Sequence, residues 1–166
     1  MNFNSYDAAH RPIGLYIHIP FCMSKCPYCD FYSVAFNAKK AREYADATVR
    51  NLLAVKDLYG DNLLADTLYF GGGTPILLGG ELIRILDAAR DILAPMNGKE
   101  PEISLEANPN SVDFNMLSSL NRAGFNRISI GVQSLVDDEL LSLGRIHNSE
   151  DAINAVNIAR SAGFRN

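Results

Sequence analysis

The feature that most constrains the fold is a unit that occurs four times: a β-rich run, a loop rich in glycine or proline, and a stretch with helical periodicity. The expected strands are Gly14–Ile19, Thr67–Phe70, Glu102–Ala107 and Arg127–Val132. Strands that alternate with helices predict an α/β fold of parallel (β/α) units. An antiparallel sheet with one wet face is the alternative, but it does not account for the helices between the strands.

Each expected helix carries an apolar stripe. Apolar residues recur at i, i+3, i+4 and i+7 from Ala41 to Leu53, and similar stripes run from Leu82 to Leu93 and from Phe114 to Ala123. The last helix is expected to begin at the cap candidate Ser149 and to stop at Gly163. We expect these stripes to cover one face of the sheet.

The expected strands have one apolar and one polar face. A period of two places Ile17 and Ile19 on one face of the first strand and Tyr16 and His18 on the other. The third and fourth strands alternate in the same way. Because a fully packed barrel interior would be apolar, polar faces on these strands predict a cavity that binds a ligand.

The loops whose residues could bind a ligand or a metal all follow strands. A cysteine loop follows the first strand, Gly71–Gly73 follows the second, Glu106 ends the third, and Gln133 with Ser134 ends the fourth. Parallel α/β folds place their active sites at the carboxyl ends of the strands. We therefore expect these four segments to converge on one site.

The length of 166 residues allows a single domain, 1–166, with residues 1–13 as an amino-terminal extension. The segment Asn121–Arg127 closes a helix and leads into a strand, and Arg160–Asn166 repeats that transition where the sequence stops. This interrupted repeat predicts the amino-terminal part of a longer barrel-like domain, truncated at its carboxyl end. A short natural protein with a ragged tail is the alternative.

Composition narrows the class of partner. No apolar run approaches the ~18 residues of a membrane span, and no export signal is recognisable in the first residues, so we expect a cytoplasmic location. A net charge of −4 offers no basic surface for nucleic acid or anionic lipid. We expect a small-molecule or protein partner, and membrane contact only through such a partner.

The three cysteines, Cys22, Cys26 and Cys29, have the spacing C-x3-C-x2-C. A closed zinc site takes four ligands and disulfides take thiols in pairs, whereas an iron–sulfur cubane with three cysteine ligands keeps one iron open. The spacing therefore favours a cluster that binds a further ligand. The alternatives are a zinc site completed by His18 and unligated core cysteines. If the loop holds a cluster, we expect His18 to be a hydrogen-bond donor near the cluster and not a ligand of it.

The stretch YIHIPFCMSKCPYCDF, residues 16–31, resembles the cluster loop of the radical S-adenosylmethionine (SAM) superfamily. The resemblance implies the amino-terminal part of a partial TIM barrel. It also implies that Cys22, Cys26 and Cys29 ligate a [4Fe-4S] cluster whose open iron chelates the amino and carboxylate groups of SAM. In that superfamily an electron from the cluster cleaves SAM to methionine and a 5′-deoxyadenosyl radical.

The motifs YFGGGTP, EANP, SIGVQS and LGRIH resemble, more narrowly, oxygen-independent coproporphyrinogen III oxidase and its heme-chaperone relative, the HemW type. Tyr16 would lie against SAM and the cluster, Gly72 to Thr74 would line the nucleoside pocket, and Glu106 would bind SAM. Gln133 and Arg145 would face the far side of SAM or a second ligand. The implied cofactor-binding residues are Tyr16, Tyr28, Gly72, Gly73, Thr74, Glu106, Gln133 and Arg145; the resemblance assigns no catalytic residue.

Each of these assignments has a simpler alternative. Gly71–Gly73 could form only a turn, and no GK[ST] follows to make a phosphate-binding loop. Glu106 could be a strand-end carboxylate paired with Arg127. Arg145 and His147 could belong to a solvated helix end.

Phe31 distinguishes the two branches of the family. The oxidases carry a further cysteine two positions after the third, and this chain has Phe31 there. The resemblance thus implies a protein that binds heme, delivers it to heme-accepting proteins, and uses a reductant such as flavodoxin or ferredoxin. One alternative is an enzyme that catalyses radical decarboxylation of the porphyrinogen coproporphyrinogen III. The other is an iron–sulfur structural or electron-transfer module. We expect no turnover from the isolated chain.

Overall fold

A four-stranded parallel sheet organises the chain. In the computed structural model, which describes residues 13–60, 65–93 and 100–166, the strand order is β1-β4-β5-β6 and every pairing is parallel. The strands are β1 (Ile13–Ile19), β4 (Ala65–Gly72), β5 (Glu102–Ala107) and β6 (Arg127–Ile130). The prediction of a parallel α/β fold is therefore confirmed, and the antiparallel alternative is wrong. Of the expected extension 1–13, residues 1–12 lie outside the described residues and Ile13 already belongs to β1.

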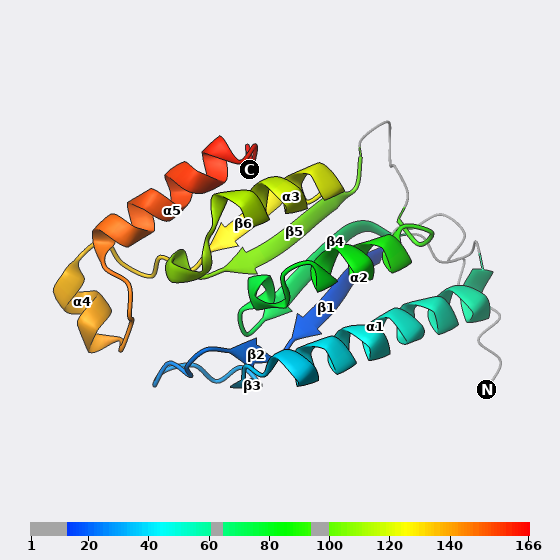
Figure 1. The fold of residues 1–166 in the computed structure, drawn as a ribbon, viewed down its shortest axis with the longest axis horizontal. Helices are drawn as coiled ribbons and strands as arrows, with labels where there is room; N and C mark the ends of the chain where they lie inside the picture. The colour runs from blue at the N-terminus through cyan, green and yellow to red at the C-terminus, as the bar shows by residue number, and fades with distance from the viewer. Residues whose placement is uncertain (1–12, 61–64, 94–99) are drawn as a thin grey trace.

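Helices cover one face of this sheet. They are α1 (Ala38–Tyr59), α2 (Glu81–Ala89), α3 (Phe114–Ala123) and α5 (Ser149–Ser161). Figure 1 shows α1, α2 and α3 in front of the sheet, with α5 beside α3. None of the helices described is both long and apolar enough to cross a membrane.

The helix starts follow from side-chain caps. Asn37 accepts a hydrogen bond from the Lys40 N–H at the start of α1. The prediction that Ser149 caps the last helix is wrong, because the preceding Asn148 accepts from the Asp151 N–H and donates its own N–H to the Asp151 carboxylate. This reciprocal pair satisfies two backbone groups at once, so the cap falls one residue earlier.

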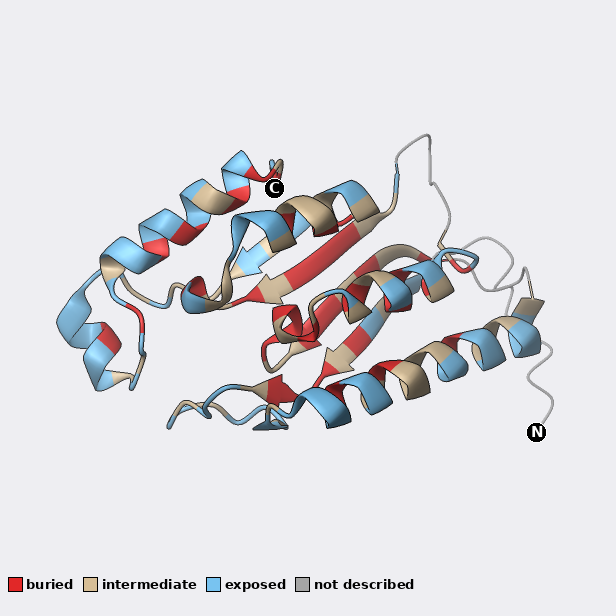
Figure 2. Cartoon of the chain, viewed as in Figure 1, coloured by how far each residue is buried: buried red, intermediate tan, exposed pale blue. Residues whose placement is uncertain are grey.

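The core lies between the helices and the apolar face of the sheet. Leu68, Phe70 and Leu105 have no exposed surface, and the Phe70 ring packs against Phe125 with centroids 5.1 Å apart. Figure 2 shows buried residues along β4 and β5 and on the helix faces turned toward the sheet, whereas the residues of β6 are exposed or half-buried. The predicted apolar face is thus where the sequence pattern placed it.

The opposite face of the sheet is polar. In the strand register Tyr16 lies beside Tyr69, Tyr69 beside Ser104, and Ser104 beside Arg127. One step further along, Glu106 lies beside Ser129. Tyr16 and Arg127 are exposed, so this face has no helix over it at these positions.

Short elements that the sequence did not predict surround the carboxyl ends of the strands. They are β2 (Phe21–Cys22), β3 (Val34–Ala35), α4 (Asp137–Ser142) and the 3-10 helices η3 (Pro75–Leu78) and η4 (Pro109–Ser111). β6 also ends two residues earlier than expected, because the chain turns at Val132 and Gln133 adopts a positive φ of 67°. All four strand arrows in Figure 1 point toward the cysteine loop and α4.

Candidate functional site

The cysteine loop is fixed at both of its ends by backbone hydrogen bonds. Val34 donates to the Pro20 carbonyl at 2.6 Å and Phe36 to the Cys22 carbonyl at 2.9 Å, which pairs β2 with β3. Between them, Cys29 donates its N–H to the Cys26 carbonyl at 3.0 Å in a tight turn. The cysteines are half-buried and none forms a disulfide, so the loop presents three thiols.

Each glycine of the Gly71–Gly73 run has a different neighbour. A Cβ on Gly71 would lie 2.8 Å from the Tyr69 ring and 2.9 Å from the Tyr16 ring. Gly72 has a φ of 117°, and a Cβ there would lie 2.7 Å from the His18 ring.

Gly73 closes the end of β4 against the cysteine loop. A Cβ on Gly73 would lie 2.5 Å from the Phe21 carbonyl oxygen and 2.9 Å from Cys22 Sγ. The Gly73 N–H donates to the Ile19 carbonyl, and the Thr74 N–H donates to the Phe21 carbonyl. The run is therefore more than a turn, because it lets β4 pass beside the cysteine loop without a side chain in the way.

Glu106 is held by two donors, one for each carboxylate oxygen. The Tyr69 hydroxyl donates to Oε1 at 2.7 Å and the Gly72 N–H to Oε2 at 3.0 Å. The alternative that Glu106 pairs with Arg127 is wrong, since Arg127 binds Glu102 at 3.1 Å. Burial, followed by the hydrogen bond to Glu106, raises the pKa of Tyr69 to about 12, so the phenol stays a protonated donor.

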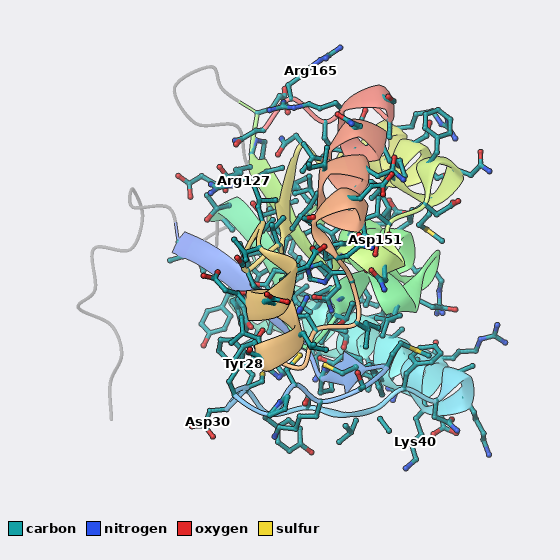
Figure 3. All side chains as sticks on the ribbon, turned by 90° about the vertical axis from the view of Figure 1, so that its left-hand side faces the viewer. Tyr28, Asp30, Lys40, Arg127, Asp151 and Arg165 are labelled. Carbon is teal, nitrogen blue, oxygen red and sulfur yellow. The ribbon has the colours of Figure 1, made fainter. Side chains whose placement is uncertain are left out.

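Arg145 reaches the cysteine loop from beyond α4. Its Nη1 donates to Cys26 Sγ at 3.3 Å and to the Tyr28 hydroxyl at 3.4 Å, while Nη2 donates to Asn108 Oδ1 at 2.8 Å and to the Gly131 carbonyl at 3.0 Å. Figure 3 looks onto this end of the molecule and shows Tyr28 beside α4. Arg145 Nε is buried without a hydrogen-bond partner among the described residues, which leaves one donor for a ligand or water.

His147, like Arg145, forms a hydrogen bond with the backbone just after β6. It is buried, and its Nε2 lies 2.9 Å from the Val132 carbonyl oxygen. The alternative of a solvated helix end is therefore wrong for both residues. They instead attach the α4–α5 connection to the ends of β5 and β6.

Asn108 links these contacts into one polar chain. It accepts from Arg145 and donates to Thr74 Oγ1 at 2.9 Å, and Thr74 Oγ1 lies 3.9 Å from Cys22 Sγ. A series of hydrogen bonds thus runs from Cys22 through Thr74, Asn108 and Arg145 to Cys26. The sequence placed Asn108 in the EANP motif, which carries the family resemblance, but did not identify it as a site residue.

Tyr16 and His18 form a separate group next to the site. The Tyr16 ring stacks on Tyr69 with centroids 6.0 Å apart and an interplanar angle of 18°. His18 Nδ1 lies 3.2 Å from the Tyr16 hydroxyl, and Nε2 lies 3.0 Å from the Tyr32 carbonyl oxygen. Both ring nitrogens of His18 therefore have partners other than the cysteines, and in the described part of the chain no set of three His, Cys, Asp or Glu side chains is gathered around one ion position.

An open cavity of about 220 Å³ lies where these segments meet. The three cysteines line it, and so do the predicted cofactor-binding residues Tyr28, Gly72, Gly73, Thr74, Glu106, Gln133 and Arg145. Tyr16 does not line the cavity, so its contact with SAM stays a prediction. The predicted convergence of four strand ends on one site is confirmed. Asn108, Ser129 and Gly131 also line the cavity and were not identified from the sequence.

A second cavity adjoins the first and is more apolar. Met23, Leu77 and Ile146 line it, together with His147. Cys26, Thr74, Asn108 and Arg145 line both cavities. The polar chain that joins Cys22 to Cys26 therefore lies between two spaces in which ligand atoms could lie, because most of its members line both.

Curated proteins similar to this chain extend well beyond it. Heme chaperone HemW of Escherichia coli (strain K12) is 43% identical over 158 residues, which cover 93% of this chain and 40% of that relative. Heme chaperone HemW of Mycobacterium tuberculosis (strain ATCC 25618 / H37Rv) is 39% identical over 160 residues, with the same coverage of 93% and 40%. The chain thus spans about 40% of the length of these relatives.

A solved structure and a family model agree with these relatives. Coproporphyrinogen III oxidase (HemN) from Escherichia coli, described as a radical SAM enzyme, matches 95% of this chain and 37% of that chain with a TM-score of 0.81 and 30% identity. The model of the radical SAM superfamily matches residues 16–166. Because this match includes the cysteine loop and every strand end at the cavity, the chain belongs to the radical SAM superfamily.

Proposed function

We propose that Cys22, Cys26 and Cys29 hold a [4Fe-4S] cluster and that the adjoining cavity binds SAM. Membership of the radical SAM superfamily implies both groups. The chain's own residues fit them, because three free thiols line one cavity and thiolates are the ligands of iron–sulfur clusters. When bound, the reduced cluster supplies the electron that cleaves SAM.

The cavity residues fit an amino acid joined to a nucleoside. Glu106 offers a fixed carboxylate, which suits an ammonium group or ribose hydroxyls. Gly72 and Gly73 let the backbone approach a ligand, and Thr74, Tyr28 and Gln133 lie around the same space. Arg145 lines both cavities, so it is placed to bind the far side of SAM or a second ligand.

For the whole protein we propose heme binding and delivery to heme-accepting proteins. The observation that carries this proposal is the similarity to curated heme chaperones, at 37–43% identity over most of this chain. Phe31 supports it, because the oxidases that the chain resembles carry a cysteine at this position. A reductant such as flavodoxin or ferredoxin and a cytoplasmic location belong to the same proposal.

A second candidate is oxidative decarboxylation of coproporphyrinogen III. The likeness in fold to the solved oxidase, at a TM-score of 0.81, favours it. In this case the SAM bound in the cavity would take part in a radical reaction on a porphyrinogen, and the protein would not transfer heme.

Two assays on the cluster-loaded protein separate these candidates. The chaperone proposal predicts a heme absorbance spectrum that changes and saturates as protein is added, with little SAM consumed. Release of carbon dioxide from coproporphyrinogen III that depends on SAM and a reductant, without heme binding, would establish the oxidase instead. A protein that does neither would be an iron–sulfur structural or electron-transfer module.

A further inference from the structure

Tyr69 is the residue that completes the surroundings of Glu106. The sequence did not identify it as a site residue, and it does not line the cavity. Its hydroxyl nevertheless donates to Glu106 Oε1 at 2.7 Å, while the Gly72 N–H occupies Oε2 at 3.0 Å. With one donor on each oxygen, both from β4, the plane of the carboxylate is fixed relative to the strand that ends at the cavity.

The position of the Tyr69 hydroxyl is set by packing of its ring. One face of the ring stacks on Tyr16, with an interplanar angle of 18°. Gly71 leaves room for both rings, since a Cβ there would lie within 2.9 Å of each. The hydroxyl is therefore held in place independently of the bond that it makes to Glu106.

Tyr69 holds the carboxylate without neutralising it. Burial raises the pKa of Tyr69 to about 12, so its phenol is an uncharged donor at neutral pH. Arg127, on the same polar face of the sheet, is paired with Glu102 and not with Glu106. Glu106 therefore offers its carboxylate oxygens to the cavity that it lines, and a carboxylate suits a cationic or hydroxyl ligand.

We propose that Tyr69 is a positioning residue that orients the Glu106 carboxylate toward the ammonium or hydroxyl groups of SAM. The inference rests on the proposed function, because it takes SAM as the ligand of Glu106. Tyr16 stacks on the Tyr69 ring and so helps to fix the position of its hydroxyl.

The test is a double-mutant cycle on the cluster-loaded chain, with the SAM dissociation constant measured by calorimetry. Tyr69→Phe keeps the stacked ring and removes the donor, so we expect SAM binding to weaken roughly ten-fold with iron content unchanged. In a Glu106→Gln background the same change should alter binding less than about two-fold, because the residue through which Tyr69 acts is already altered. Tyr59→Phe, at the exposed end of α1, is the matched control and should leave binding unchanged.

The outcomes that overturn the inference are distinct from those that overturn the proposed function. Unchanged SAM binding in Tyr69→Phe, or an equal loss with and without Glu106→Gln, would show that the hydroxyl does not act through the carboxylate. A cluster-loaded wild-type chain that binds no SAM would overturn the proposed function, and the inference with it.

Discussion

The core between the sheet and its helices and the site at the carboxyl ends of the strands are held together by different interactions. Between the sheet and its helices, large apolar side chains such as Phe70, Phe125 and Leu86 have no exposed surface. At the carboxyl ends, the cysteine loop and α4 are mostly exposed, as Figure 2 shows, and are attached by hydrogen bonds and by glycines that permit close approach.

Stability and ligand binding therefore depend on different parts of this chain. Apolar burial stabilises the helix-covered sheet, which does not depend on a ligand. The rim of the cavity, formed by the cysteine loop, Gly71–Gly73, Asn108 and the α4–α5 connection, buries few apolar groups. Because a small number of polar contacts hold the rim in place, it should open more readily than the core. Changes in the core should therefore alter global stability, whereas changes in the rim should alter ligand binding.

The largest effect on stability is expected from Phe125→Ala. Phe125 is fully buried against Phe70, and removing its ring leaves a cavity, so we expect a loss of about 3–5 kcal/mol in the free energy of unfolding. Denaturant unfolding followed by circular dichroism measures it. Phe114→Ala, at an exposed position on α3, is the control and should cost far less. Similar losses at the two positions would contradict the assignment of the core.

The next effect is expected at the rim, from Gly73→Ala. The new Cβ would lie 2.5 Å from the Phe21 carbonyl oxygen, so the cysteine loop must move and cluster loading should fall several-fold. The helical circular dichroism signal should persist. Iron and sulfide analysis after reconstitution checks this, with Gly80→Ala as the control, because a Cβ on Gly80 meets nothing within 4 Å. Normal loading of Gly73→Ala would remove the proposed role of this contact.

A smaller effect is expected from Asn108→Ala, which breaks the polar chain between the cysteines. The substitution leaves Arg145 and Thr74 without their shared partner, a local cost of about 1–3 kcal/mol. Hydrogen exchange should become faster in the cysteine loop and the α4–α5 connection and stay unchanged in the sheet. Asn115→Ala, exposed on α3, is the matched control. Faster exchange throughout the chain would mean that the rim and the core are not separable.

The smallest effect is expected from Tyr69 at high pH. An unfolded tyrosine loses its proton near its ordinary pKa of 10.0, whereas folded Tyr69 keeps it until about 12. The stabilising contribution of this phenol is therefore complete below pH 10 and is lost as the pH rises toward 12. Absorbance titration of wild type against Tyr69→Phe should show one late-titrating tyrosine, and Glu106→Gln should lower its pKa. A difference curve centred near pH 10 would contradict this.

The sequence predicted those features that depend on local periodicity. Alternation of strands with helices predicted the parallel sheet, and the period of two predicted that Ile17 faces the helices and Glu106 the polar side. The order of glycines and cysteines along the chain predicted one shared site, because all of them follow strands.

The remaining features depend on which distant segments become neighbours. β2 and β3 have two residues each, too few to carry a pattern. The Arg145 contact with Cys26 joins residues 119 positions apart, and the Tyr69 contact with Glu106 joins residues 37 apart. The pairing of Arg127 with Glu102, rather than with Glu106, was equally hidden, since both acidic residues lie on the same face of β5.

We propose that a cluster held by three cysteines keeps one iron open and that SAM bound in the adjoining cavity reaches this iron. The most direct measurement is the electron paramagnetic resonance spectrum of the chain, reconstituted with iron and sulfide without oxygen and then reduced, before and after SAM is added. We expect a [4Fe-4S]⁺ signal that changes when SAM is added. A cluster signal indifferent to SAM, or zinc bound in place of iron, would contradict it.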